Sequence, residues 1–395
     1  MLLTLDKAIY YSLVLFAFTA PLSVAGQSIF TTLAILLAVI NWVKTRTMPS
    51  IPTGIGIKSI YLFFGVIFLS VLFSYEPIKS FAVFWTHVAR FLLFFVVIQY
   101  VRQRNQVETI FLAVAAGWIM TDVYAIIQWL HGNWRATGFY SHHMMFGNCL
   151  TMIVPLLLAQ ITNQRVSLRW LIFTAAFVLS VIALLANGSR GAWLAMLSIP
   201  IVLTAVDRSI LKNRIFMLLM ITTILIAILG IMYYPPIQAR ILSITDMSDF
   251  SNANRIWLWQ SAYHLWSNSL VLGIGIGNYE NYFNHYLDPR SEFFGKHMHA
   301  HSNFMQLLAE TGIVGLIAFI FMFCQLSLHH YRVAVASNTD QWRKTTALGV
   351  LLLTVTLFIQ GAVEYNMGAA VVARQFWFFT ALAFAAYQVP HESNS

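Results

Sequence analysis

The chain has 395 residues, of which 59% are hydrophobic and only 9% carry charge, and its mean hydropathy is +0.72. Soluble domains carry roughly 25% charged residues, so this composition excludes an ordinary soluble protein. The formal net charge of +9 is compatible with a nucleic-acid partner, but in so apolar a chain membrane topology explains it better, and we expect no nucleic acid to bind.

Apolar runs alternate with short polar breaks along the whole chain. Each run is about 17–25 residues long, the length that a helix needs to cross a bilayer, which predicts an all-α polytopic membrane protein with about twelve transmembrane helices. We expect a single integral membrane domain, 1–395, with one large polar loop, 235–300, between helices nine and ten that carries part of the functional site. The expected spans are 8–25, 28–43, 59–75, 81–101, 107–130, 144–161, 170–186, 192–206, 215–234, 303–328, 345–365 and 371–387.

Basic residues distinguish the two sides of the membrane. Twelve spans place both termini on one side, and fourteen of the 23 basic residues fall on that side. The short breaks on the other side hold Lys79, Arg135 and Arg190, with Arg374 near the start of the last span. The positive-inside rule therefore predicts cytoplasmic termini and an external loop at 235–300. The fourteen residues are Lys7, Lys44, Arg46, Lys58, Arg102, Arg104, Arg165, Arg169, Arg208, Lys212, Arg214, Arg332, Arg343 and Lys344.

Three outward-facing arginines oppose this charge bias. Arg190 lies in the turn Asn187-Gly188-Ser189-Arg190-Gly191, where an unpaired charge near hydrocarbon costs roughly 2.5–3.5 kcal/mol. Arg135 lies in an outer break, and Arg255 begins an aromatic run typical of an interfacial helix. Guanidinium groups suit phosphate, and several of them can hold a diphosphate without a metal. The alternatives are headgroup contact or pairing with a carboxylate for Arg190, headgroup contact for Arg135, and interface anchoring for Arg255.

The segment His297-Met298-His299-Ala300-His301-Ser302 precedes the tenth span. Its alternating histidines do not share one helix face and lack an HExxH pattern, so zinc is the less favoured reading, and Asp246 with Asp249 is a weak alternative metal site. We interpret His301 as a general base beside Ser302, a plausible N-cap. The helix dipole and nearby arginines should keep its imidazole neutral. We expect no metal and no cofactor, and we expect His301 and Arg190 to share one water-facing cavity.

Two further features are weaker. Gly273-Ile274-Gly275-Ile276-Gly277 lacks the flanking strand and spacing of a dinucleotide fingerprint, so we interpret it as a turn that lets loop backbone pack closely. His142 and His143 lie in an outer break and are candidates for the path of an acceptor.

The chain resembles the O-antigen ligase family within the O-antigen ligase and polymerase superfamily. His301-Ser302, nine residues and then Gly312-Ile313-Val314-Gly315 are similar to the family motif His-[Asn/Ser/Gln]-x9-Gly-x-x-Gly. The turn Ser189-Arg190-Gly191 resembles the family's Ser-Arg-Gly turn, and Arg135 and Arg255 fall where members place phosphate-binding arginines. The resemblance covers essentially the whole chain and implies a GT-C-like helical fold.

The resemblance implies a glycosyltransferase of lipopolysaccharide biosynthesis in the inner membrane of a Gram-negative bacterium, with its active site on the periplasmic face. The donor would be an O-antigen polysaccharide on undecaprenyl diphosphate, and the acceptor a sugar hydroxyl of the lipid A-core. His301 would take the hydroxyl proton in a metal-independent, inverting transfer. Arg190 and Arg255, helped by Arg135, would bind the diphosphate.

Three alternatives stay open. An O-antigen polymerase or an O-linked protein oligosaccharyltransferase would use the same donor and similar motifs. A twelve-helix transporter should show repeated halves or paired broken helices, and no such halves are evident in the sequence. Ligase is the favoured interpretation.

Overall fold

The computed structural model describes residues 4–47, 52–162, 166–246, 249–296 and 298–389, and all regular elements within these ranges are helical. The prediction of an all-α polytopic protein is thereby confirmed. The first half of the chain forms α1 (Leu5–Thr19), α2 (Val24–Thr45), α3 (Ile55–Leu72), α4 (Pro77–Tyr100), α5 (Arg104–Leu130), α6 (His143–Thr162) and α7 (Leu168–Asn187).

The second half alternates short and long helices. It forms α8 (Arg190–Met196), α9 (Ser198–Val206), η1 (Arg208–Lys212), α10 (Arg214–Tyr233), α11 (Pro235–Leu242), α12 (Phe250–Ser267), α13 (Tyr279–Tyr282), η2 (Phe283–His285), α14 (Asn303–Val335), α15 (Gln341–Gln360) and α16 (Ala370–Gln388). The expected loop 235–300 is therefore largely structured, and α12 includes the aromatic run that begins at Arg255.

Ten helices in the described ranges are long and apolar enough to cross a membrane, compared with about twelve predicted. The two other expected spans also form helices, but shorter ones. α1 has 15 residues, and the segment Arg190–Val206 is divided at Leu197 into α8 and α9. Pro200 explains the division, because it has no N–H to donate to the carbonyl of Met196 and its ring crowds that carbonyl.

α14 is too long to be a single straight span. Its 33 residues would extend about 50 Å at 1.5 Å per residue, whereas the hydrocarbon core is about 30 Å thick. The helix is broken at Gly312, whose φ of 65° and ψ of −169° are not helical. The residues before Gly312 form a separate short segment that begins directly after His301.

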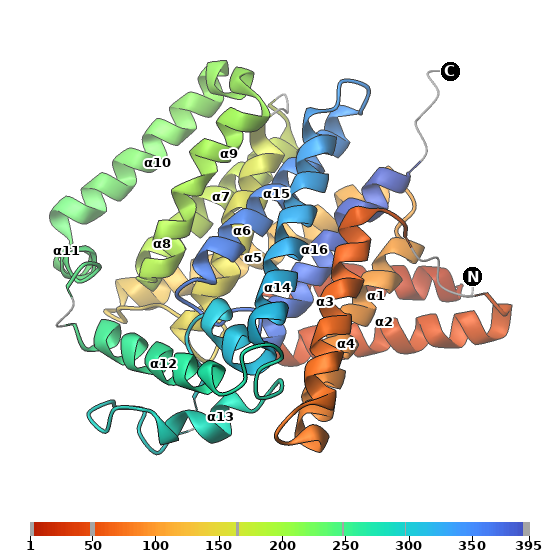
Figure 1. Cartoon of the computed structure of the whole chain (residues 1–395). Helices are drawn as coiled ribbons and strands as arrows, with labels where there is room; N and C mark the ends of the chain where they lie inside the picture. Colours follow the sequence, from red (N-terminus) through yellow and green to blue (C-terminus); the bar gives the residue numbers. More distant parts are fainter. Residues whose placement is uncertain (1–3, 48–51, 163–165, 247–248, 297, 390–395) are drawn as a thin grey trace.

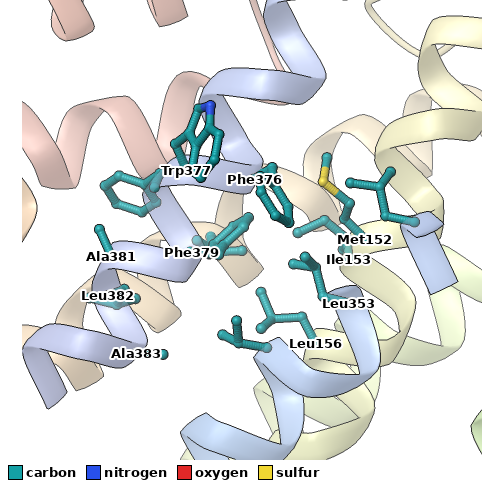
Figure 2. Packing of buried hydrophobic residues seen from close by; sticks show 14 of the residues in the cluster. Met152, Ile153, Leu156, Leu353, Phe376, Trp377, Phe379, Ala381, Leu382 and Ala383 are labelled. Atoms are coloured by element: carbon teal, nitrogen blue, oxygen red, sulfur yellow. The ribbon is translucent and has the colours of Figure 1, made fainter. Parts of the chain in front are cut away.

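α6, α15 and α16 are the most completely enclosed of the long helices (Figure 1). Figure 2 shows Met152, Ile153 and Leu156 of α6 facing Leu353 of α15 and the aromatic side chains Phe376 and Phe379 of α16. Small residues allow this close approach, since a Cβ on Gly349 would lie 3.1 Å from Leu156 Cδ1 and 3.3 Å from Ala159 Cβ. This core fixes the ends of the helices that carry the candidate site.

The turns α5–α6, α7–α8 and α15–α16, together with the segment from α11 to the start of α14, meet at one end of the bundle. The backbone N–H of Ala136 donates to Ala186 O at 3.1 Å, and that of Asn303 donates to Gly361 O at 2.8 Å. We call this the site end and the other the opposite end. Figure 1 shows α12 and α13 gathered at the site end, in the lower part of the view.

We predict that Gly349→Leu destabilises the protein by about 1–3 kcal/mol, because the added side chain overpacks the contact between α15 and α6. The measurement is the midpoint of thermal unfolding of the purified protein in detergent. Gly65→Leu in α3 is the matched control, since a Cβ at Gly65 meets nothing within 4 Å. Equal midpoints for the two variants would contradict the packing described here.

Candidate functional site at the site end

The turn between α7 and α8 places Arg190 inside the protein. Gly188 ends α7 in the left-handed region, with φ +67°, and Ser189 is the N-cap residue of α8. Asn187 Nδ2 fixes the turn by donating to Ala136 O at 2.9 Å and to His143 O at 2.8 Å. Arg190 is the first residue of α8 and is only 7% exposed. The glycine therefore serves to turn the chain and bury the arginine.

The guanidinium of Arg190 is held by the segment between α11 and α12. Its NH1 donates to Ser243 O at 2.6 Å and to Ser243 Oγ at 2.8 Å. Its NH2 donates to Asn252 Oδ1 at 2.8 Å and forms a 3.3 Å ion pair with Asp249 Oδ1. Asp249 is also the N-cap of α12, where its side chain accepts from Asn252 N. The same carboxylate thus starts α12 and fixes Arg190 against it.

One face of α12 completes a cavity of about 240 Å³ around Arg190. Asn252, Arg255, Ile256 and Trp259 line it, and their spacing of three, four and seven residues puts them on one side of the helix. Arg255 NH2 donates to Glu364 Oε1 at 2.7 Å, and its NH1 donates to Ser251 Oγ at 3.2 Å. The ion pair joins α12 to the turn after α15.

A second cavity, of about 300 Å³, is also lined by Arg255. Arg135, His142, His143 and His301 line it together with Arg255. Arg190 and His301 therefore line two cavities that share Arg255 rather than the single cavity that the sequence led us to expect. The arrangement brings all four predicted side chains to the same end of the bundle.

His301 occupies a strained position beside a carboxylate. Its φ is 48°, in the left-handed region, and its side chain is almost fully enclosed. Nδ1 lies 3.6 Å from Glu364 Oε2, and the ring packs on those of Phe293 and His299. Ser302 follows as the N-cap of α14, and its Oγ accepts from Met305 N at 3.3 Å. His297 lies outside the described residues.

Arg135 is the least satisfied of the three arginines. Its guanidinium makes no hydrogen bond to any residue in the described ranges, and its Nε is buried. Burial lowers the pKa of Arg135, and the positive charges of Arg190 and Arg255 lower it further. Its φ is 72°, so it and His301 are two of the three non-glycine residues with positive φ in the described part of the chain. Such strain persists where the surrounding structure enforces it, often at functional sites.

Glu364 is a residue that the sequence analysis missed. Its side chain is 7% exposed and bridges Arg255 and His301. Burial would raise the pKa of Glu364, but His301, Arg255 and His299 together outweigh burial, so the pKa lies below its ordinary value. Burial, reinforced by His301, lowers the pKa of His299 to about 3, which keeps that ring neutral near pH 7. The carboxylate is thus the negative centre of a positive cluster.

Arg240 of α11 is a fourth arginine near this cluster, and it too escaped the sequence analysis. Its Nε donates to Gly188 O at 3.2 Å, next to the turn that places Arg190. Burial, followed by the charges of Arg190 and Arg135, lowers the pKa of Arg240 to about 10. In the sequence, Arg240 lies in a segment interpreted as a polar loop, and that pattern does not indicate its position beside the turn of Arg190.

At the glycines of the predicted motif, the backbone of α14 forms hydrogen bonds with the loop that precedes it. At the break, the N–H groups of Ile313 and Val314 donate to Leu270 O at 3.0 Å and Val271 O at 3.3 Å. In return, Ala309 O and Glu310 O accept from Ile274 N and Gly275 N at 3.0 and 2.9 Å. A Cβ on Gly312 would lie 2.2 Å from Val271 O. The motif glycine therefore exchanges helix hydrogen bonds for hydrogen bonds to the loop.

The fold and site define a polytopic helical membrane protein with arginines gathered around an enclosed histidine–glutamate pair at one end of its bundle. Residues 175–320 match the family model of the O-antigen ligases, and this match supports the resemblance seen in the sequence. The matched segment contains Arg190, Arg255, His301 and Gly312, while Arg135 and Glu364 lie outside it. No curated protein matches the chain.

We predict that Gly312→Ala releases the loop from α14, because the new methyl group meets backbone and the residue must keep a positive φ. Amide hydrogen exchange in residues 268–285 should rise, while exchange in α6 and α15 stays as in the wild type. Gly65→Ala is the control, with open space at its Cβ. Wild-type exchange in the Gly312 variant would show that the hydrogen bonds between the loop and α14 do not depend on the glycine.

Proposed function

We propose that the protein is an O-antigen ligase that transfers a polysaccharide from undecaprenyl diphosphate to a sugar hydroxyl of the lipid A-core. The observation that carries the proposal is the arrangement of Arg135, Arg190 and Arg255 around His301 and Glu364, within or beside a segment that matches the O-antigen ligase model. The positive-inside rule predicts that this end faces the periplasm, where both lipids would be met.

The two cavities suggest separate binding sites for the donor and the acceptor. The diphosphate of the donor would lie against Arg190 and Arg255, whose guanidinium forks suit its oxygens. Arg135, which has no hydrogen-bond partner among the described residues, would gain one on the diphosphate from the other side. The acceptor sugar would enter the cavity that His142, His143 and His301 line. Arg255 lies between donor and acceptor because it lines both cavities.

His301 would act as the general base. Its Nδ1 faces Glu364, which leaves Nε2 to accept the proton of the acceptor hydroxyl. The hydroxyl oxygen forms a bond to the anomeric carbon from the face opposite the diphosphate, and the bond from that carbon to the phosphate oxygen breaks with inversion. The electron pair leaves on the diphosphate, where the arginines stabilise it. The imidazolium then returns its proton to water.

Glu364 would act as a positioning residue. It holds Arg255 through the 2.7 Å ion pair and stabilises the imidazolium that forms on His301. Neither step calls for a metal ion, because guanidinium groups supply the positive charge.

The first test is ligation by the purified protein in the presence of a chelator, with lipid-linked donor and three separate acceptors: lipid A-core, further donor and a pilin-like protein. A ladder of modified lipid A-core is the expected product. Modification of further donor would identify a polymerase, and modification of the pilin a protein oligosaccharyltransferase. Absence of product with all three acceptors would favour the transporter interpretation.

We predict that His301→Ala lowers kcat by about 10²–10⁴-fold, the usual contribution of a general base. Arg190→Ala should cost at least as much, because stabilisation of developing charge is commonly the largest catalytic effect. Arg290→Ala is the control, since Arg290 is an exposed residue of the same segment that pairs with Asp288 and lines neither cavity. Near-wild-type ligation by both site variants would refute the assignment.

We predict that Glu364→Gln lowers kcat and moves the acidic limb of the pH profile of kcat/KM to lower pH. The sign follows because an imidazolium loses stabilisation when the neighbouring negative charge is removed. Glu280→Gln, which removes an exposed carboxylate of the same end, serves as the control. A lower rate with an unmoved acidic limb would assign Glu364 to structure alone.

A further inference from the structure

Two buried polar side chains, Gln306 and Glu310, lie in the helical segment that follows His301 and ends at the break of α14. They are 4% and 1% exposed, and their spacing of four residues places them on the same face of the segment. Gln306 Nε2 donates to Glu310 Oε1 at 2.9 Å. Neither side chain lines the two cavities of the candidate site, so any part in the reaction must be exerted through other residues.

Glu310 fixes this pair to the loop between α12 and α13. Its Oε1 also accepts from Tyr279 N at 3.1 Å, and the backbone N–H of Gly277 is a further donor to the carboxylate. A buried carboxylate needs such donors, because they replace the water lost on burial. The loop therefore holds the Glu310 side chain in a single position.

Gln306 connects Glu310 to the residue before His301. Gln306 Oε1 accepts from Ala300 N at 2.8 Å, so the side chain reaches back past Ser302, the N-cap of α14. Ala300 is fully buried, and a buried backbone N–H requires an acceptor. Because Gln306 supplies that acceptor, the position of Ala300 depends on it.

His301 is thereby flanked by two anchors. Gln306 holds Ala300 on one side, and on the other Asn303 N donates to Gly361 O at 2.8 Å. Between them His301 keeps a φ of 48°, which a residue other than glycine retains only where its surroundings enforce it. Loss of one anchor would allow the turn to relax and would move the imidazole relative to Glu364, which lies 3.6 Å from its Nδ1.

We propose that Gln306 and Glu310 are positioning residues of the transfer reaction, holding the turn of His301 so that its Nε2 faces the acceptor hydroxyl. The inference rests on the proposed role of His301 as the general base. The hydrogen bonds of this pair lead to Ala300 and to the loop at 277–279, and not to the arginines that bind the diphosphate. The pair therefore controls the rate of transfer and leaves the affinity for the donor unaltered.

The first test is Gln306→Leu in the full-length protein, assayed with lipid-linked donor and lipid A-core. We expect kcat to fall about 10²-fold, the cost of misplacing a reacting group by about 1 Å, with the Kd of undecaprenyl diphosphate unchanged. Gln160→Leu is the control, because it makes the same substitution at a glutamine of α6 that is 6% exposed and lies at the opposite end. Wild-type kcat in Gln306→Leu, or equal losses in the two variants, would overturn the proposal.

A double-mutant cycle with His301→Ala separates positioning from general damage to the structure. If Gln306 acts only through His301, adding Gln306→Leu to His301→Ala lowers the residual rate no further. A second loss of about 10²-fold in that background would overturn the positioning role. Wild-type kcat in His301→Ala alone would instead refute the proposed base, so the cycle distinguishes the two failures.

A paired exchange tests the proposal without deleting either polar side chain. Glu310→Gln replaces one acceptor oxygen by an amide donor that faces other donors, and it should lower kcat. Adding Gln306→Glu restores an acceptor for every donor of the pair in the reverse order, and it should recover most of the lost kcat. Wild-type kcat in Glu310→Gln, or no recovery in the double variant, would contradict the proposal.

Discussion

The ion pair between Arg255 and Glu364 joins the two halves of the candidate site. Arg255 lies on α12, in the segment that the sequence presented as a loop, and Glu364 lies in the turn between two core helices. With side chains 16% and 7% exposed, the pair is largely enclosed, and removing one partner of such a pair commonly costs roughly 3–5 kcal/mol. Its geometry therefore fixes α12, and with it Arg190, relative to His301.

The break in α14 also stabilises this arrangement of the site residues. A membrane helix cannot leave backbone groups unsatisfied in the hydrocarbon, so a break needs outside partners. The segment 270–275 supplies them, and its close approach depends on Gly273 and Gly312, where any Cβ would meet backbone. His301 thus directly precedes a short helical segment that hydrogen bonds to the segment 270–275 hold in place.

Hydrophobic periodicity predicted the helical class and most helix positions, since each long apolar run can satisfy its backbone only as a helix. The prediction failed where one residue changed a run. Pro200 divided the expected span 192–206. The expected span 345–365 ends at Gln360, so Glu364 lies in the turn after the helix and faces the site.

The outward arginines were recognisable because they opposed the charge bias, and Ser302 because of its place before a helix. The pairing of Arg190 with Asp249, of Arg255 with Glu364, and the position of Arg240 depend on tertiary contacts that no local pattern encodes. A lone carboxylate at the end of an apolar run was the available signal for Glu364.

In the proposed mechanism, the arginines bind the diphosphate while His301 accepts the proton of the acceptor hydroxyl. The most direct measurement is the Kd of undecaprenyl diphosphate for wild type, Arg135→Ala and His301→Ala, each checked for unchanged thermal unfolding. Arg135 suits this measurement because no described residue accepts a hydrogen bond from it, so the variant removes no internal contact of that kind. We expect at least tenfold weaker binding by Arg135→Ala and wild-type affinity in an inactive His301→Ala. Equal affinity in all three proteins, or a selective loss in His301→Ala, would contradict it.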